Sequence, residues 1–204
     1  MYISPIFKNE DQKSITEFIH QNGFALLISQ VTGRPWATHL PVMLTKDDQG
    51  RDILVGHIAK ANNQWKDFDK NEEVLVVFSG PHTYISSSWY NHENVPTWNY
   101  LAVHVYGKIN IIEGEELKKQ LTHLVDKYEV NMKNPVSVPT MSADYIEKQM
   151  LGIVGFTIEI TEIQATKKLS QNRDRVNKDN IIDELKQQND AGSTAIATSM
   201  KNLL

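Results

Sequence analysis

Short strand-like runs separated by turn residues occupy the first part of the chain, and this pattern most constrains the fold. Three such runs follow one another closely: Phe24–Gln30, Trp36–Leu44 and Ile53–Ala59. The segments between them, Thr32–Pro35 and Asp47–Arg51, are rich in Gly, Pro and Asp, which are residues typical of turns. This spacing predicts an antiparallel meander joined by hairpins.

Further strand-like runs continue the pattern along the chain. Val74–Ser79 is a buried strand that we expect to end at Gly80-Pro81, with Tyr84–Ser86 continuing the sheet after a kink. Thr97–Ile112 and Ile153–Ala165 alternate apolar and polar residues, as half-buried strands do. The chain therefore carries about six or seven strands in antiparallel order.

Helical patterns appear before and after these strands. Glu115–Tyr128 is the clearest, because its leucines recur at helical spacing and acidic residues begin it. Four other segments favour helix, namely Asp11–Asn22, Asn62–Phe68, Ala143–Met150 and Lys178–Gln188, and Ala191–Leu204 has a weak helical pattern. No Gly-rich turn joins a strand to a helix, so a Rossmann site or P-loop is not expected. We expect an α+β, mainly β protein: an antiparallel Greek-key barrel with peripheral helices.

Composition narrows the functional class. The chain has no cysteine, which excludes disulfides, thiolate metal sites and a Cys nucleophile. Its first residues lack the apolar stretch of a signal peptide, and no run is long enough to span a membrane, so we expect a cytoplasmic protein. The net charge of −4 disfavours a protein that binds DNA through its surface.

Polar side chains interrupt the strand-like runs at several places. Buried polar groups cost free energy unless they are paired, so interruptions on neighbouring strands indicate a shared polar pocket. The interrupting residues are Thr38, His39, His57, Lys60, Asn62, Ser79, Thr97, Trp98, Asn99, His104 and the segment Lys168–Arg173.

Each single interruption also has an ordinary structural interpretation. A lone histidine in a strand is usually a core or edge residue, and Lys60 is equally compatible with a solvated turn. His39, His57 and His104 lack acidic partners at ligand spacing, so no metal site is expected. No G-x-S-x-G motif is present, which disfavours a serine hydrolase.

Six motifs follow one another along the chain: ATHLP (37–41), GHIAKANNQW (56–65), FSGPHTYISSSWY (78–90), VPTWNYLAVHVYG (95–107), IVGFTIEIT (153–161) and KLSQNR (168–173). In this order they make the sequence resemble the PaiB family, described as FMN-binding proteins and negative transcriptional regulators of sporulation and protease synthesis. The chain departs from the family in having Asn63 and Ser87 where proline is usual. Both positions lie in loops, where loss of proline affects rigidity more than ligand chemistry.

The resemblance implies an FMN-binding split β-barrel, related to pyridoxamine-phosphate oxidase-like flavoproteins, that forms a homodimer with flavin sites between subunits. It implies a barrel domain over residues 1–170 and a C-terminal segment, 171–204, packed on the barrel or on the partner. It implies that Lys60 binds the FMN phosphate. The other implied cofactor contacts are Thr38, His39, Leu40, His57, Ile58, Ala59, Asn62, Ser79, Thr97, Trp98, Asn99, Lys168, Ser170, Gln171 and Arg173.

Three functions stay open at this point. The first is a flavin-binding regulator, although no helix-turn-helix pattern supports direct contact with DNA. The second is an FMN-dependent oxidoreductase with His39, His57 or Tyr100 as proton donor. The third is a barrel that holds haem through His39, His57 or His104.

Overall fold

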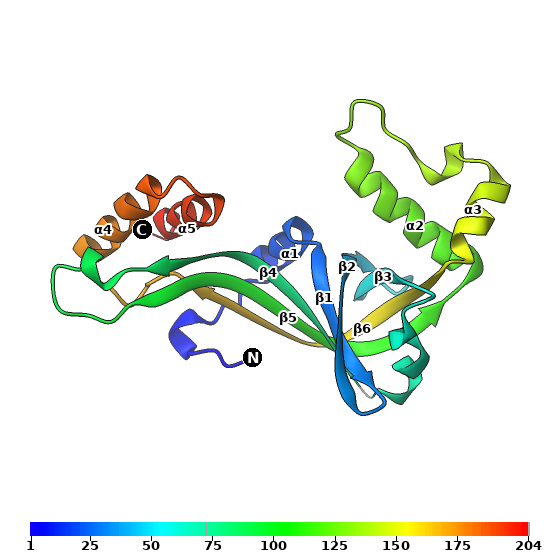
Figure 1. The fold of residues 1–204 in the computed structure, drawn as a ribbon, viewed down its shortest axis with the longest axis horizontal. Helices are drawn as coiled ribbons and strands as arrows, with labels where there is room; N and C mark the ends of the chain where they lie inside the picture. The colour runs from blue at the N-terminus through cyan, green and yellow to red at the C-terminus, as the bar shows by residue number, and fades with distance from the viewer. Residues whose placement is uncertain (72, 204) are drawn as a thin grey trace. The chain divides into compact units, whose positions relative to one another are not determined.

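The computed structural model describes residues 1–71 and 73–203. Within these residues, six strands close into an antiparallel barrel in the order β1-β2-β3-β6-β5-β4 (Figure 1). The expected antiparallel barrel is therefore confirmed. The strands are β1 (Phe24–Val31), β2 (Arg34–Lys46), β3 (Asp52–Ala59), β4 (Val74–Ile85), β5 (Thr97–Ile112) and β6 (Ile153–Lys168).

The expected helices are present, with α3 and the long strand β5 at the predicted boundaries. The predicted short helix after β3 is the 3₁₀ helix η2 (Asn63–Lys70). The α-helices are α1 (Gln12–Gln21), α2 (Gly114–Glu129), α3 (Ala143–Met150), α4 (Arg175–Gln187) and α5 (Ala191–Lys201), and the other 3₁₀ helices are η1 (Pro5–Phe7), η3 (Ser87–Trp89) and η4 (Val138–Thr140). No helix in the described part of the chain is long and apolar enough to cross a membrane.

The β1–β2 hairpin shows why the first turn forms where the sequence predicts it. The strands pair antiparallel down to Val31 opposite Arg34, which leaves a two-residue loop. Both loop residues, Thr32 and Gly33, have positive φ angles of 49° and 78°. Such tight hairpin loops twist in the same sense as their strands, and glycine adopts this conformation without strain.

The chain divides into two compact units, each described separately below. The first unit comprises Met1–Phe18, Phe78–His104 and Gln164–Leu204, and the second comprises Ile19–Val77 and Val105–Ile163. Strands β1, β2 and β3 lie wholly in the second unit, whereas α4 and α5 lie wholly in the first.

The second unit has its core inside the barrel. Leu27, Val42 and Leu54 from the first three strands are fully buried. Phe156 on β6 meets Phe68 edge to face, with ring centroids 6.0 Å apart. Gly56 on β3 makes room for this ring, because a Cβ there would lie 2.7 Å from Phe156 Cζ.

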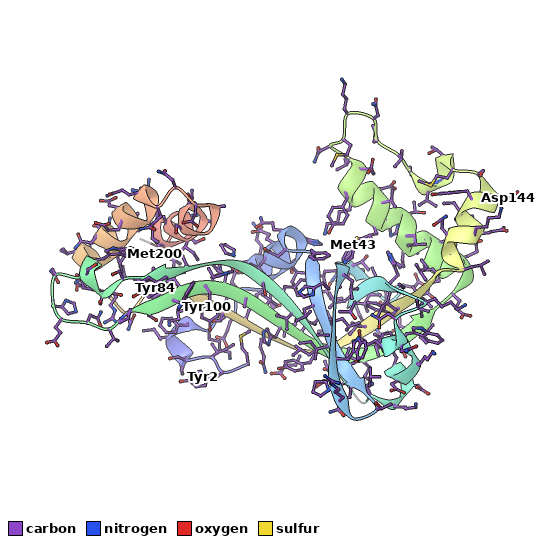
Figure 2. All side chains as sticks on the ribbon, in the orientation of Figure 1. Tyr2, Met43, Tyr84, Tyr100, Asp144 and Met200 are labelled. Carbon is purple, nitrogen blue, oxygen red and sulfur yellow. The ribbon has the colours of Figure 1, made fainter. Side chains whose placement is uncertain are left out.

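Helix α2 covers the outer face of the β2–β3 hairpin. Leu124 of the helix is buried in one cluster with Met43, Ile53 and Val55. Met43 is labelled on this hairpin in Figure 2. The leucine stripe read in the sequence is therefore the face that packs on the strands.

The first unit has a separate core under its C-terminal helices. Ile181 and Leu185 of α4 and Ile196 of α5 are completely buried, together with Ile85 of β4. Figure 1 shows α4 and α5 side by side. The weak helical pattern after residue 190 thus corresponds to a helix whose apolar residues contribute to a real core.

Strand β4 corrects one prediction, because it runs through Gly80-Pro81 without ending there. Its register with β1 pairs Leu75–Val77 with Leu26–Ile28, and Pro81 lies four residues further along β4. Proline lacks an N–H donor, and a strand tolerates it where no neighbour needs that donor.

Candidate functional site

Three polar residues near the end of β3 form a closed ring of hydrogen bonds. The backbone N–H of Gln64 donates to Asn62 Oδ1 at 3.1 Å. Asn62 Nδ2 donates to Thr38 Oγ1 at 2.8 Å. The Thr38 hydroxyl donates to Gln64 Oε1 at 2.6 Å, which closes the ring. The structure therefore brings together two predicted site residues, Thr38 and Asn62, from different elements.

Gln64 is the hub of this ring, and it was not among the predicted site residues. Its side chain is fully buried. Its Nε2 donates to Ser29 Oγ at 3.0 Å and to the Leu27 carbonyl at 3.3 Å on β1. A glutamine in a polar segment resembles a surface residue, and the available signal was its place two residues after Asn62, which caps η2.

Lys60 follows β3 directly, and its backbone is held from two sides. Its N–H donates to the Gly152 carbonyl at 2.8 Å, and its carbonyl accepts from Trp65 Nε1 at 3.0 Å. Its side chain is exposed, and no carboxylate among the described residues pairs with its ammonium. A rigid backbone with an unpaired cation suits the binding of an anion.

A cavity of about 500 Å³ opens beside Lys60 in the second unit. This volume is within the range of small-molecule sites, which is roughly 300–1,000 Å³. The wall is mostly apolar, with Trp65 on one side and the carboxylates of Glu113 and Glu147 among its polar groups. The remaining lining residues are Ile111, Ile112, Gly114, Leu117, Met150, Leu151, Ile153 and Val154.

The other predicted residues on β2 and β3 differ in exposure. Leu40 and Ile58 are buried. His39 and Ala59 are exposed, and the His39 ring stacks on Phe24 at 6.1 Å between centroids.

His57 is half-buried on the face that α2 covers. It lines a small space with Leu117, Gln120 and Leu121 of the helix. Burial lowers the pKa of His57 below its usual 6.5, because the charged imidazolium is less well solvated there. His57 is therefore held in its neutral form at neutral pH.

The remaining predicted residues belong to the first unit, where four of them form two bonded pairs. Lys168 Nζ donates to Thr97 Oγ1 at 2.6 Å, and burial lowers the pKa of the Lys168 ammonium. Ser170 Oγ donates to Oδ1 of fully buried Asn99 at 3.1 Å. Asn99 in turn lies against Met200 of α5, labelled in Figure 2, with 3.5 Å between Nδ2 and Sδ.

The last four predicted residues of this unit have varied surroundings. The Gln171 side chain accepts from the Leu169 N–H and donates to the Lys167 carbonyl. The Arg173 guanidinium lies over the Tyr90 ring, with Cζ 5.2 Å from the centroid. Two are exposed, Ser79 and Trp98, the latter at 54%.

The donor set of the second unit fits FMN. A phosphate dianion needs a cation, and Lys60 offers an unpaired ammonium. The polar edges of a flavin need donors and acceptors held in place, and the Thr38–Asn62–Gln64 ring supplies both. The described residues contain no group of three or more histidines and carboxylates arranged to hold a metal.

Comparison with known proteins identifies relatives over the whole chain. The chain is 43% identical over 204 residues to "Protease synthase and sporulation protein PAI 2" of Bacillus subtilis (strain 168), covering 100% of this chain and 98% of the relative. It is 27% identical over 223 residues to an uncharacterized protein of Emericella nidulans, covering 89% of each.

Solved structures with the same fold include flavin-binding proteins. The FAD and heme binding protein from Mycobacterium smegmatis matches with a TM-score of 0.62 at 11% identity, over 84% of this chain and 78% of that chain. The flavocytochrome Anf3 from Azotobacter vinelandii matches with a TM-score of 0.60 at 16% identity, over 81% and 72%. At such low identity these matches establish the split-barrel fold alone.

A family model described as "Putative FMN-binding domain" matches residues 1–162. This match and the full-length Bacillus relative confirm the resemblance read from the six motifs. The chain therefore belongs to the PaiB family of FMN-binding proteins, with FMN as the cofactor of its domain.

Proposed function

We propose that Lys60 binds the phosphate of FMN and that the β2–β3 region binds the remainder of the flavin. The Lys60 ammonium, exposed directly after β3 and unpaired by any carboxylate among the described residues, is the observation that supports this most directly. On this proposal Thr38 and Asn62 contact polar flavin atoms through their side chains. The strand segments that carry His39, Leu40, His57, Ile58 and Ala59 border the site on this proposal.

We propose further that the protein works as a homodimer. On this proposal, the predicted site residues that lie in the first unit contribute to the flavin site of the partner subunit. Exposed aromatic residues of this unit support an interface, because Trp98 and Tyr84 are 54% and 45% exposed and their rings meet at 6.0 Å. The contributed residues would be Ser79, Thr97, Trp98, Asn99, Lys168, Ser170, Gln171 and Arg173.

When bound, FMN supplies electron and hydride transfer, and the chain supplies binding and orientation. Lys60 neutralises the negative charge of the phosphate. The hydrogen bonds to Gln64 hold Thr38 and Asn62 in place for contact with the flavin. Burial lowers the pKa of His57, which keeps this residue neutral at neutral pH.

The biological role we propose is regulation of sporulation and protease synthesis in the cytoplasm, as the name of the Bacillus relative suggests. The 43% identity over the full length carries this proposal. Regulation is indirect, because the net charge of −4 does not favour a phosphate-binding surface.

A mobility-shift assay with candidate promoter DNA at low and at physiological salt tests the indirect mode. We expect no shift at either salt. A sequence-specific shift that weakens with salt would show direct binding to DNA and contradict the indirect mode. A deletion strain with unchanged protease output and sporulation would contradict the regulatory role itself.

A second candidate function is an FMN-dependent oxidoreductase that acts on a small molecule. The cavity of about 500 Å³ favours it, because its mostly apolar wall offers space for a substrate. Bleaching of the flavin absorbance by NADH or NADPH under anaerobic conditions tests this function. A flavin that stays oxidised with both reductants would count against it.

A further inference from the structure

The hydrogen-bond ring through Gln64 has a fixed direction. The Gln64 backbone N–H is a donor only, so the Asn62 atom that it meets must be Oδ1, and Nδ2 faces Thr38. The Leu27 carbonyl is an acceptor only, so the Gln64 atom that it meets must be Nε2, and Oε1 faces Thr38. Backbone groups at both ends therefore determine how each side-chain amide is oriented.

This direction decides what Thr38 and Asn62 offer to a ligand. A hydroxyl has one proton and two acceptor positions. Thr38 gives its proton to Gln64 and accepts from Asn62, so its remaining capacity is to accept. Asn62 uses Oδ1 and one Nδ2 proton within the ring, so its second N–H is left to donate. Both side chains are only partly buried, unlike Gln64.

One acceptor and one donor therefore lie side by side, with 2.8 Å between Thr38 Oγ1 and Asn62 Nδ2. A cis-amide edge, –CO–NH–, has the complementary pattern. Its nitrogen and oxygen are roughly 2.3 Å apart, given C–N and C=O bonds of about 1.33 and 1.23 Å. Two nearly parallel hydrogen bonds then join this amide edge to Thr38 Oγ1 and Asn62 Nδ2. An ionised phosphate oxygen is a hydrogen-bond acceptor only. It would therefore face the acceptor lone pair of Thr38, which is unfavourable.

We propose that Gln64 is a positioning residue that makes Thr38 and Asn62 recognise the cis-amide edge of the flavin pyrimidine ring. The proposal rests on FMN binding as proposed above. Gln64 itself does not touch the flavin. It acts by consuming the Thr38 proton, so that Thr38 accepts the N3–H of the ring and Asn62 donates to the neighbouring carbonyl.

Titrations of the full-length protein with FMN and with N3-methyl-FMN, followed by flavin fluorescence, test this proposal. The methyl group removes the N3–H donor and leaves the phosphate and ribityl chain intact. Wild type should bind the methylated flavin roughly tenfold more weakly than FMN, about the effect of one lost hydrogen bond. Gln64→Met should bind FMN more weakly and should lose most of this discrimination.

A matched pair at Thr38 covers the case in which Gln64→Met does not fold. Thr38→Ser keeps the hydroxyl and should keep the discrimination, whereas Thr38→Val keeps the shape without the hydroxyl and should lose it. Thermal unfolding of each variant separates loss of fold from loss of recognition.

The outcomes separate the two proposals. Equal binding of FMN and N3-methyl-FMN by wild type, or full discrimination retained by Gln64→Met or Thr38→Val, would overturn the recognition inference while FMN binding stands. Failure of wild type to bind either flavin would instead overturn the proposed function.

Discussion

The indole N–H of Trp65 donates to the backbone carbonyl of Lys60 at 3.0 Å. This bond ties η2 to the end of β3 and fixes the backbone from which the lysine side chain extends. The ammonium is left unpaired by any acid in the described residues, beside a cavity lined partly by the same tryptophan. Position and charge thus make Lys60 the best candidate for phosphate binding.

Lys60→Ala should weaken FMN binding and leave riboflavin binding nearly unchanged. A hydrogen bond to a charged group contributes about 1.5–3 kcal/mol, which corresponds to roughly 10- to 150-fold in affinity. Fluorescence titrations with both flavins measure the change. Lys66→Ala is the matched control, because Lys66 is an exposed lysine of η2 and its loss changes the net charge equally. Equal weakening by both variants would indicate a general charge effect.

The neutral state of His57 predicts how stability depends on pH. Because its pKa is lowered in the folded protein, the unfolded chain takes up a proton at this residue first as the pH falls through about 6.5. Stability is therefore full above that pH and is lost below it, by at most about 1.4 kcal/mol per pH unit. Urea unfolding of wild type and His57→Gln from about pH 8 to about pH 5 tests this. Parallel curves for the two proteins would contradict it.

Gly56 is predicted to be intolerant of even a single methyl group. A Cβ would lie 2.7 Å from Phe156 Cζ in the barrel core, so Gly56→Ala should cost about 1–3 kcal/mol of unfolding free energy. Gly152→Ala is the control, because its Cβ would meet only the Gln149 carbonyl at an ordinary 3.4 Å, and it should change stability by less than about 0.5 kcal/mol. Similar losses for both, measured by urea unfolding, would show that the ring can move aside.

The proposed dimer predicts a specific effect at Trp98. This exposed side chain meets both Tyr84 and His82, at 6.0 and 6.2 Å between ring centroids. Trp98→Ser should weaken dimerisation measurably, by roughly 2 kcal/mol or more if the residue is a hot spot. Light scattering after gel filtration over a dilution series measures it, with Val176→Ser, an exposed apolar residue of α4, as control. A wild-type protein that is monomeric throughout would remove the dimer proposal.

Periodicity predicted much of the fold because its signals are local. The alternation over Thr97–Ile112 and the helical pattern over Ala143–Met150 have the same first and last residues as β5 and α3. The path of β4 through Pro81 was missed, because whether a strand tolerates proline depends on the neighbour that would need its N–H.

The candidate site was only partly readable from the sequence. Thr38 and Asn62 stood out as polar residues next to apolar strands, and the structure joins them directly. Gln64 did not stand out, because its burial depends on strands that are distant in the sequence. Its side chain bonds to Ser29 on β1 and Thr38 on β2, which precede it by 35 and 26 residues. Long-range packing of this kind leaves no local pattern.

The most direct test of the account is the absorption spectrum of the purified protein, followed by titration of the flavin-free protein with FMN. We expect a bound flavin, or saturable binding of FMN that is tighter than binding of riboflavin because of Lys60. A protein that binds neither flavin, while circular dichroism shows it folded, would contradict the central claim.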